Sequence, residues 1–366
     1  MRVKKIFKII GNILLLLLLL SVIFLAVMFA VHTNLNKKEF DSLTHSGYAN
    51  LVQARDYKLN VCSYGNENGS HKLVALSGYG VYDYSVTLRK VTDEFADDNL
   101  IIFPDRAGCG LSDDTSLDIT TENVVENYRA ALKNAGFEAP YVLLPHSLGG
   151  AYATYWESTY PEEIEGIVFI DCTQLSDGDT FEDMEENPAF VDTFYTYACK
   201  LGLHRLVFHK FWYYLPDSYT EEQQKISDEL GCHNGQSKAL NSEFEQMNNI
   251  CTDAYRSIVK NDIPKVYINS SWGIRTEEDF DEMWNWTYTQ SQKNGIPMMK
   301  PSDAQYNEIC SKAIEQAKEL TETKLMPYLE LMGNCECVNL AGDHYIFEQK
   351  PEECAQIVEE FLNSLK

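Results

Sequence analysis

The sequence has 366 residues, of which 45% are hydrophobic and 23% are charged, enough for one large α/β domain with an insertion or for two domains. The formal net charge is −25, and because six of the 30 basic residues but none of the 55 acidic residues precede Glu39, the remainder carries −31. So acidic a body repels nucleic acid and anionic lipid headgroups, which argues against both as partners.

The first segment has the pattern of a membrane anchor. Four basic residues precede an apolar run from about Ile13 to Val31, which is long enough to span the hydrocarbon core of a bilayer. The best match to the small-x-small motif of signal peptidase, Met28-Phe29-Ala30, puts a large residue where a small one belongs, which favours an uncleaved helix. Two basic residues, Lys37 and Lys38, flank the other end of the run. Because they are fewer than the four before it, the positive-inside rule places the N-terminus in the cytoplasm. We therefore expect a single-pass protein of the cell membrane with its body outside the cytoplasm.

Beyond the anchor, short apolar strands alternate with helices. Such continuous apolar strands predict a mostly parallel sheet covered by helices on both faces. The expected strands are 57–62, 73–76, 100–103, 141–144, 166–170, 265–268 and 335–340. The expected helices are 85–95, 121–135, 151–159, 302–331 and 351–365.

About ninety residues separate the strands 166–170 and 265–268, and they are rich in aromatic side chains at helical spacing. This stretch predicts a helical cap, whose aromatic residues form either its core or an apolar part of a substrate site. The expected division of the chain is a basic tail and anchor (1–38), the first part of the core (39–171), the cap (172–262) and the second part of the core (263–366).

The run 143–150, Leu-Leu-Pro-His-Ser-Leu-Gly-Gly, is typical of a nucleophile elbow. An apolar strand ends abruptly, one serine hydroxyl is presented at the carboxyl edge of the sheet, and small residues let the following helix pack closely. Ser147 is the candidate nucleophile. Pro145 occupies the place of the first glycine of the G-x-S-x-G pattern, which predicts a slightly reshaped elbow.

His344 follows the last predicted strand and precedes the last helix. In an open α/β sheet this position lies at the same carboxyl edge as Ser147, where sites of this architecture form. A serine hydroxyl needs an adjacent base near neutral pH, so His344 is the candidate general base.

Over residues 55–366 the chain resembles the α/β-hydrolase superfamily. The resemblance rests on the turn 77–80, the loop 105–112, the elbow and the glycine-then-histidine segment before Pro351. It implies that Ser147 attacks, that His344 acts as base, and that the backbone N–H groups of Tyr79 and Leu148 form the oxyanion hole. Members that dehalogenate alkyl halides or open epoxides use an aspartate as nucleophile, which argues against those reactions here.

The acid that orients His344, the third member of a Ser-His-acid triad, is less sharply specified. No carboxylate follows the strand 265–268 directly, where much of the family has its acid, and Asp171, at the end of the strand 166–170, is the preferred candidate. The alternatives are Glu277, Glu278, Asp279 and Asp281. Asp105 is expected to tie down its own loop, Asp343 merely to adjoin His344, and His146 to pack behind the elbow.

These features predict a membrane-anchored serine hydrolase that cleaves an ester, thioester or amide of a small, partly apolar molecule through an acyl-enzyme on Ser147. An aminopeptidase or acyltransferase on the same fold and a catalytically silent binding module are the alternatives. No metal or cofactor motif occurs, so neither is expected. The expected partners are the small-molecule substrate and the lipid bilayer; the ten cysteines define no pairing, and the oligomeric state stays open.

Overall fold

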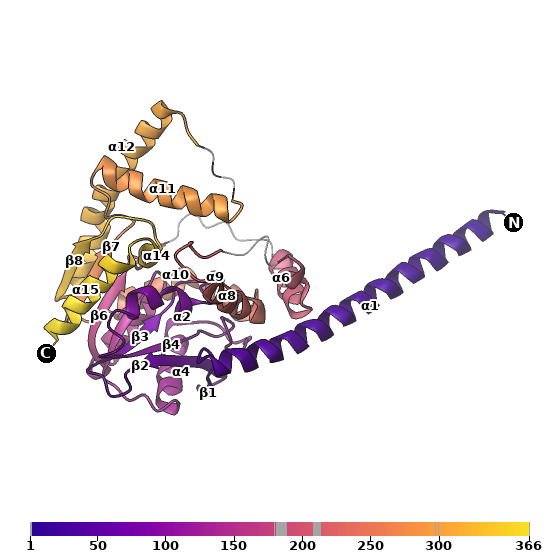
Figure 1. The fold of residues 1–366 in the computed structure, drawn as a ribbon, viewed down its shortest axis with the longest axis horizontal. Coiled ribbons are helices and arrows are strands. Elements are labelled where there is room, and N and C mark those ends of the chain that lie inside the picture. The colour runs from indigo at the N-terminus through magenta and orange to yellow at the C-terminus, as the bar shows by residue number, and fades with distance from the viewer. Residues whose placement is uncertain are drawn as a thin grey trace.

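The computed structural model describes residues 2–178, 180, 189–207, 214–296, 298 and 300–365. Its centre is an eight-stranded sheet with the order β1-β2-β4-β3-β5-β6-β7-β8 (Figure 1). β1 and β2 pair antiparallel, β2 pairs antiparallel with β4, and every pair from β4 to β8 is parallel. The strands are β1 (Leu51–Gln53), β2 (Lys58–Gly65), β3 (Lys72–Leu76), β4 (Leu100–Pro104), β5 (Tyr141–Pro145), β6 (Ile164–Ile170), β7 (Lys265–Asn269) and β8 (Cys335–Asn339).

Helices cover both faces of the sheet, as the sequence predicts. Because successive side chains of a strand point to opposite faces, Leu143 joins one apolar core while Val142 and Leu144 join the other. The first core includes α4 (Thr121–Asn134), α5 (Gly149–Thr159), α10 (Met247–Ser257) and α13 (Met326–Met332). The second includes α2 (Tyr84–Thr87), α3 (Arg89–Thr92), α14 (Ile346–Gln349) and α15 (Pro351–Ser364).

Two of the expected helices are interrupted. The stretch 85–95 forms two single-turn helices, α2 and α3, with Leu88 as the residue between them. The stretch 302–331 consists of α12 (Asp303–Leu320), a π-helical turn η3 (Thr321–Leu325) and α13, with Pro327 near the start of α13. Proline lacks the N–H that continues a regular helical ladder, which accounts for the irregular turn before it.

The described residues between β6 and β7 form helices joined by loops, such as 171–178, 214–220 and 258–264. This stretch contains α6 (Ala189–Lys200), η2 (Leu203–Leu206), α8 (Glu221–Asn234), α9 (Lys238–Glu245) and α10. The aromatic residues Phe190, Phe194, Tyr195 and Tyr197 of α6 are exposed, so they are not core of the cap. The aromatic residues Phe208, Phe211, Trp212 and Tyr213 lie outside the described residues.

The anchor is the first part of one long helix, α1 (Arg2–His45), which continues past the expected boundary at residue 38. Among the described residues it is the one helix long and apolar enough to cross a membrane. Its last turns belong to the body, because Leu43 is completely buried with Tyr48 and Val86. Figure 1 shows α1 leaving the body as a straight rod whose N-terminal part contacts nothing else.

Candidate active site

Ser147 lies in the sharp turn between β5 and α5. Its φ of 53° is in the left-handed region that L-residues rarely adopt, which is the strained geometry of a nucleophile elbow. Gly149 makes the turn possible, since a Cβ there would lie 2.2 Å from the carbonyl oxygen of Leu76. Pro145 ends β5 opposite Leu76, and the next N–H, that of His146, donates to Leu76 O at 2.9 Å. The hydrogen-bond ladder between β3 and β5 therefore continues one residue after Pro145, through the N–H of His146, although proline has no N–H of its own.

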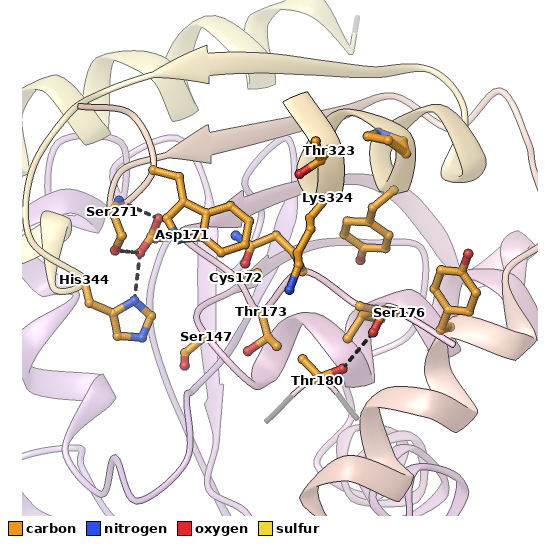
Figure 2. A pocket seen from close by; sticks show the side chains of 16 residues that line it. Ser147, Asp171, Cys172, Thr173, Ser176, Thr180, Ser271, Thr323, Lys324 and His344 are labelled. Atoms are coloured by element: carbon orange, nitrogen blue, oxygen red, sulfur yellow. Dashed lines mark hydrogen bonds and ion pairs between the residues drawn. The ribbon is translucent and has the colours of Figure 1, made fainter. Parts of the chain in front are cut away.

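Asp171 and His344 meet at the carboxyl edge of the sheet, next to Ser147 (Figure 2). His344 Nδ1 is 2.7 Å from Asp171 Oδ2, although the two residues are 173 positions apart in the sequence. Figure 2 shows the other ring nitrogen of His344 turned toward the side where Ser147 lies. The structure records no hydrogen bond between Ser147 Oγ and this ring within the described residues; such bonds commonly tighten only when substrate is bound.

The Asp171 carboxylate is surrounded by donors from the end of β7. Its Oδ1 accepts from the backbone N–H groups of Ser270 at 2.9 Å and Ser271 at 3.0 Å, and its Oδ2 accepts from Ser271 Oγ at 2.5 Å. Burial opposes ionisation of Asp171, but the hydrogen bonds from His344 and Ser271 outweigh it and lower the pKa of the carboxyl. For His344, partial burial is outweighed by the charge and hydrogen bond of Asp171, which raise the pKa of the imidazole. The pair thus holds a carboxylate against a basic imidazole.

His146 supports the loop that carries His344. The side chain is buried, its Nε2 is 3.0 Å from the carbonyl oxygen of His344, and the two ring centroids are 4.6 Å apart. Burial and the neighbouring His344 lower the pKa of His146 to about 3, so its ring is neutral and Nε2–H donates. His146 lies behind the elbow, at the place expected for it.

The two expected oxyanion donors flank Ser147. A Cβ on Gly78 would lie 2.8 Å from Ser147 Cβ, so only glycine lets the turn 77–80 approach this closely. Neither the N–H of Tyr79 nor that of Leu148 donates to another group within the described residues. Lack of a partner among the described groups is what an oxyanion donor requires, so the predicted role of both N–H groups stays open.

A buried guanidinium fixes the position of this turn. Arg106 donates to the carbonyl oxygens of Ser77 and Gly78, both at 2.5 Å, and forms an ion pair with Glu243 of α9 at 2.7 Å. Arg106 and Glu243 are each only 3% exposed. The turn is thereby connected through Arg106 to the cap.

A cavity of about 440 Å³ adjoins Ser147 and His344. Trp272, Tyr255, Tyr328 and Leu175 give it apolar walls, and several hydroxyl-bearing side chains border it as well. Figure 2 shows Lys324, from the π-helical turn η3, directed into the same space. The cavity therefore suits a molecule that is partly apolar and partly polar.

No family model matches the chain. An uncharacterized protein of Bacillus subtilis is 34% identical over 156 residues, which are 43% of this chain and 46% of that protein. A cis-3-alkyl-4-alkyloxetan-2-one decarboxylase of Shewanella oneidensis is 29% identical over 114 residues, 30% of this chain and 35% of that protein. The chain thus spans less than half the length of these curated relatives.

The solved structures match over a much longer stretch. An epoxide hydrolase is 14% identical, with a TM-score of 0.55, over 87% of this chain and 99% of its own. A haloalkane dehalogenase from Bradyrhizobium elkani is 12% identical, with a TM-score of 0.52, over 86% of this chain and 97% of its own. The protein has the α/β-hydrolase fold.

Within the α/β-hydrolase fold, four of the other carboxylates considered from sequence have local hydrogen bonds. Asp279 accepts from the backbone of Arg275 and Thr276 at the start of α11 (Glu277–Lys293), and Asp281 accepts from Tyr306 Oη. Asp105 accepts from Asn60 Nδ2 and the Leu111 N–H, and burial raises its pKa to about 7. Asp343 accepts from Thr287 Oγ1 at 2.7 Å. Of the described carboxylates, only Asp171 has a hydrogen bond to the ring of His344.

Sequence reasoning missed the residues that support this α/β-hydrolase site. Ser270 and Ser271 follow β7, and two hydroxyl residues directly after a predicted strand were the available signal for donors at the sheet edge. Arg106 stands in a loop that the sequence singles out, but nothing in its spacing pairs it with Glu243. All ten cysteines are unpaired, and the described residues contain no cluster of three or more His, Cys, Asp or Glu side chains that could hold a metal ion.

Proposed function

We propose that the chain is a membrane-anchored serine hydrolase that cleaves an ester, thioester or amide through an acyl-enzyme on Ser147. The observation that carries this proposal is the 2.7 Å contact between His344 Nδ1 and Asp171 Oδ2 beside a serine with φ 53°. A base held by a buried carboxylate next to a strained serine is the arrangement that acyl transfer requires.

In this mechanism His344 Nε2 takes the proton of Ser147 Oγ while the oxygen attacks the substrate carbonyl carbon. The carbonyl oxygen becomes an oxyanion that accepts from the N–H groups of Tyr79 and Leu148. The Asp171 carboxylate stabilises the imidazolium, which then gives its proton to the leaving group. Water repeats the same steps on the acyl-enzyme and releases the acid.

The structural neighbours do not decide the reaction. The named examples are an epoxide hydrolase and a haloalkane dehalogenase, whereas the superfamily resemblance associates those reactions with an aspartate nucleophile. Ser147 occupies that position here and favours acyl chemistry. The apolar and hydroxyl-bearing walls of the cavity support a small, partly apolar substrate.

The proposed location follows from α1. The helix spans the cell membrane once, with Lys4, Lys5 and Lys8 in the cytoplasm and the body outside it. The lipid bilayer and a small-molecule substrate are then the partners. Protease digestion of intact cells and of inverted membranes tests the orientation: only the former should remove the body.

The decisive experiment uses the full chain in detergent. A fluorophosphonate probe should label the protein, and short p-nitrophenyl esters should be hydrolysed. Ser147→Ala should abolish labelling and reduce turnover by about 10⁶-fold, whereas Ser257→Ala, a control on α10 away from the cavity, should leave both unchanged. Absence of labelling and of ester or amide hydrolysis in the folded wild type would sink the hydrolase proposal.

A further inference from the structure

The outer face of α6 carries an unusual set of exposed aromatic residues. Phe190, Phe194 and Tyr197 recur at i, i+4 and i+7, so they form one stripe along the helix. They are 75%, 66% and 58% exposed, and Tyr195 beside them is 56% exposed. Within the described residues outside α1, every exposed aromatic side chain lies on α6. A contiguous apolar stripe of this kind marks a surface that meets something other than water.

The same face continues onto η2. Leu206 and Val207 are exposed there, and a largely apolar cavity of about 490 Å³ lies between α6 and η2. Phe194, Tyr195 and Val207 line this cavity and are exposed, so the cavity opens at the aromatic face. We call α6 and η2, from Phe190 to Val207, the aromatic face.

The aromatic face lies against the last turns of the apolar run of α1. A Cβ on Gly202, between α6 and η2, would lie 2.4 Å from His32 Cβ and 3.2 Å from the carbonyl oxygen of Met28. Arg205 of η2 donates to His32 Nδ1 at 2.8 Å and to Glu39 at 2.6 and 2.8 Å. Figure 1 shows α6 at the edge of the body from which α1 emerges, beside the part of α1 nearer the body. The face is therefore held at the depth where α1 leaves its apolar run.

The two described cations within this face, Lys200 and Arg205, are already paired. Arg205 pairs with Glu39, and Lys200 pairs with Asp114. The body as a whole is strongly acidic, so attraction to anionic headgroups does not explain the face. Aromatic side chains, by contrast, favour the boundary between headgroups and acyl chains regardless of lipid charge.

We propose that the aromatic face enters the headgroup region of the same bilayer that α1 spans, with lipid as its partner. The inference rests on the membrane anchoring proposed above, and not on the reaction at Ser147. It makes the cap a second membrane contact, in which Phe190, Phe194 and Tyr197 are covered by lipid and the cavity between α6 and η2 opens into the bilayer.

The test is tryptophan quenching in vesicles of phosphatidylcholine whose acyl chains carry bromine, with the full chain reconstituted. Phe194→Trp and Tyr197→Trp each add one indole to the five native ones. The emission added by either variant should be mostly lost in brominated vesicles relative to unbrominated ones. It should be unaffected by 0.5 M salt. Ile309→Trp, on the exposed surface of α12 and far from α1 in Figure 1, is the matched control and should keep its added emission.

Equal quenching at Phe194→Trp, Tyr197→Trp and Ile309→Trp would overturn the proposal, and so would recovery of the wild type in the soluble fraction after carbonate extraction. Fluorophosphonate labelling of the same vesicles separates the two proposals. Labelling without selective quenching would disprove only the proposal that the aromatic face enters the bilayer. Selective quenching without labelling would support that proposal and disprove the hydrolase proposal.

Discussion

The carboxyl edge of the sheet and the aromatic face of the cap are held in opposite ways. At the edge, Asp171 receives four hydrogen bonds from three residues, and neighbouring strand ends fix all of them. On the aromatic face, the aromatic side chains of α6 are exposed, and α6 and η2 are joined to α1 chiefly through Arg205. Groups that move protons are placed by redundant bonds, whereas a surface that meets a fluid partner needs only to be held at the right depth.

After the loss of Ser147 itself, the largest expected effect concerns the redundant edge. Asp171→Asn removes the charge that holds and stabilises the imidazolium of His344, so kcat should fall by about 10⁴-fold while the fold is retained. Asp343→Asn, one residue from His344, is the matched control and should cost far less. Steady-state kinetics on a p-nitrophenyl ester with far-UV circular dichroism checks both. Near-normal activity of Asp171→Asn would transfer the role to another carboxylate.

Glu243 is the point where the two regions join, since it belongs to cap helix α9 but pairs with Arg106 beneath the turn 77–80. Glu243→Ala leaves a buried guanidinium without its counter-charge and should destabilise the protein by about 3–5 kcal/mol. The exposed Glu245→Ala, two residues on, should stay within about 0.5 kcal/mol of wild type. Thermal unfolding in detergent measures both. Equal stability of the two variants would mean that the cap and the edge are energetically independent.

A smaller effect tests the redundancy itself. Ser271→Ala removes one of the four hydrogen bonds to Asp171 but keeps the two backbone donors. The loss of one hydrogen bond to a charged group, about 1.5–3 kcal/mol in isolation, should be partly absorbed by the others, so kcat should fall about tenfold. A loss as large as that of Asp171→Asn would show that Ser271 Oγ, and not the set of donors, positions the carboxylate.

The smallest expected effect is a shift in the pH dependence of the rate, which tests the pairing of His344 with Asp171 at the sheet edge. His344 must be neutral to accept the proton of Ser147, and Asp171 raises the pKa of its imidazole. The rate should therefore fall as pH decreases through a pKa above the usual value of about 6.5 for histidine. The residual activity of Asp171→Asn should have its inflection at lower pH. An inflection of the wild type clearly below 6.5 contradicts the assigned pair.

Local signals explain which parts the sequence predicted. The strand β5, the turn at Ser147 and the helix after it are encoded by adjacent residues, and the place of His344 follows from strand order alone. The positions of the Asp171 donors depend on how β6 and β7 align, because Ile170 pairs with Ile268 and so brings Ser270 and Ser271 to the carboxylate. Register of this kind is a property of tertiary packing.

The periodicity of α6 was visible too, but not what lies against it. Aromatic residues four apart define one side of a helix, whether that side faces a core, a substrate or a membrane. Only the structure shows that Phe190 and Phe194 are exposed and that Gly202 lies against α1. Of the two predicted roles for these side chains, burial in the cap core is wrong, and contact with a substrate stays a prediction.

The unbroken course of α1 from Arg2 to His45 has a mechanical consequence. From Val31 to the buried Leu43 the helix rises about 18 Å without a hinge, so the body cannot swivel independently of the apolar rod that we propose spans the membrane. An apolar run of fixed length answers a thicker or thinner membrane by changing its tilt. Because the helix is rigid, any change in its tilt rotates the whole domain by the same angle. Membrane thickness would thus set how the mouth of the Ser147 cavity is aimed at the lipid surface.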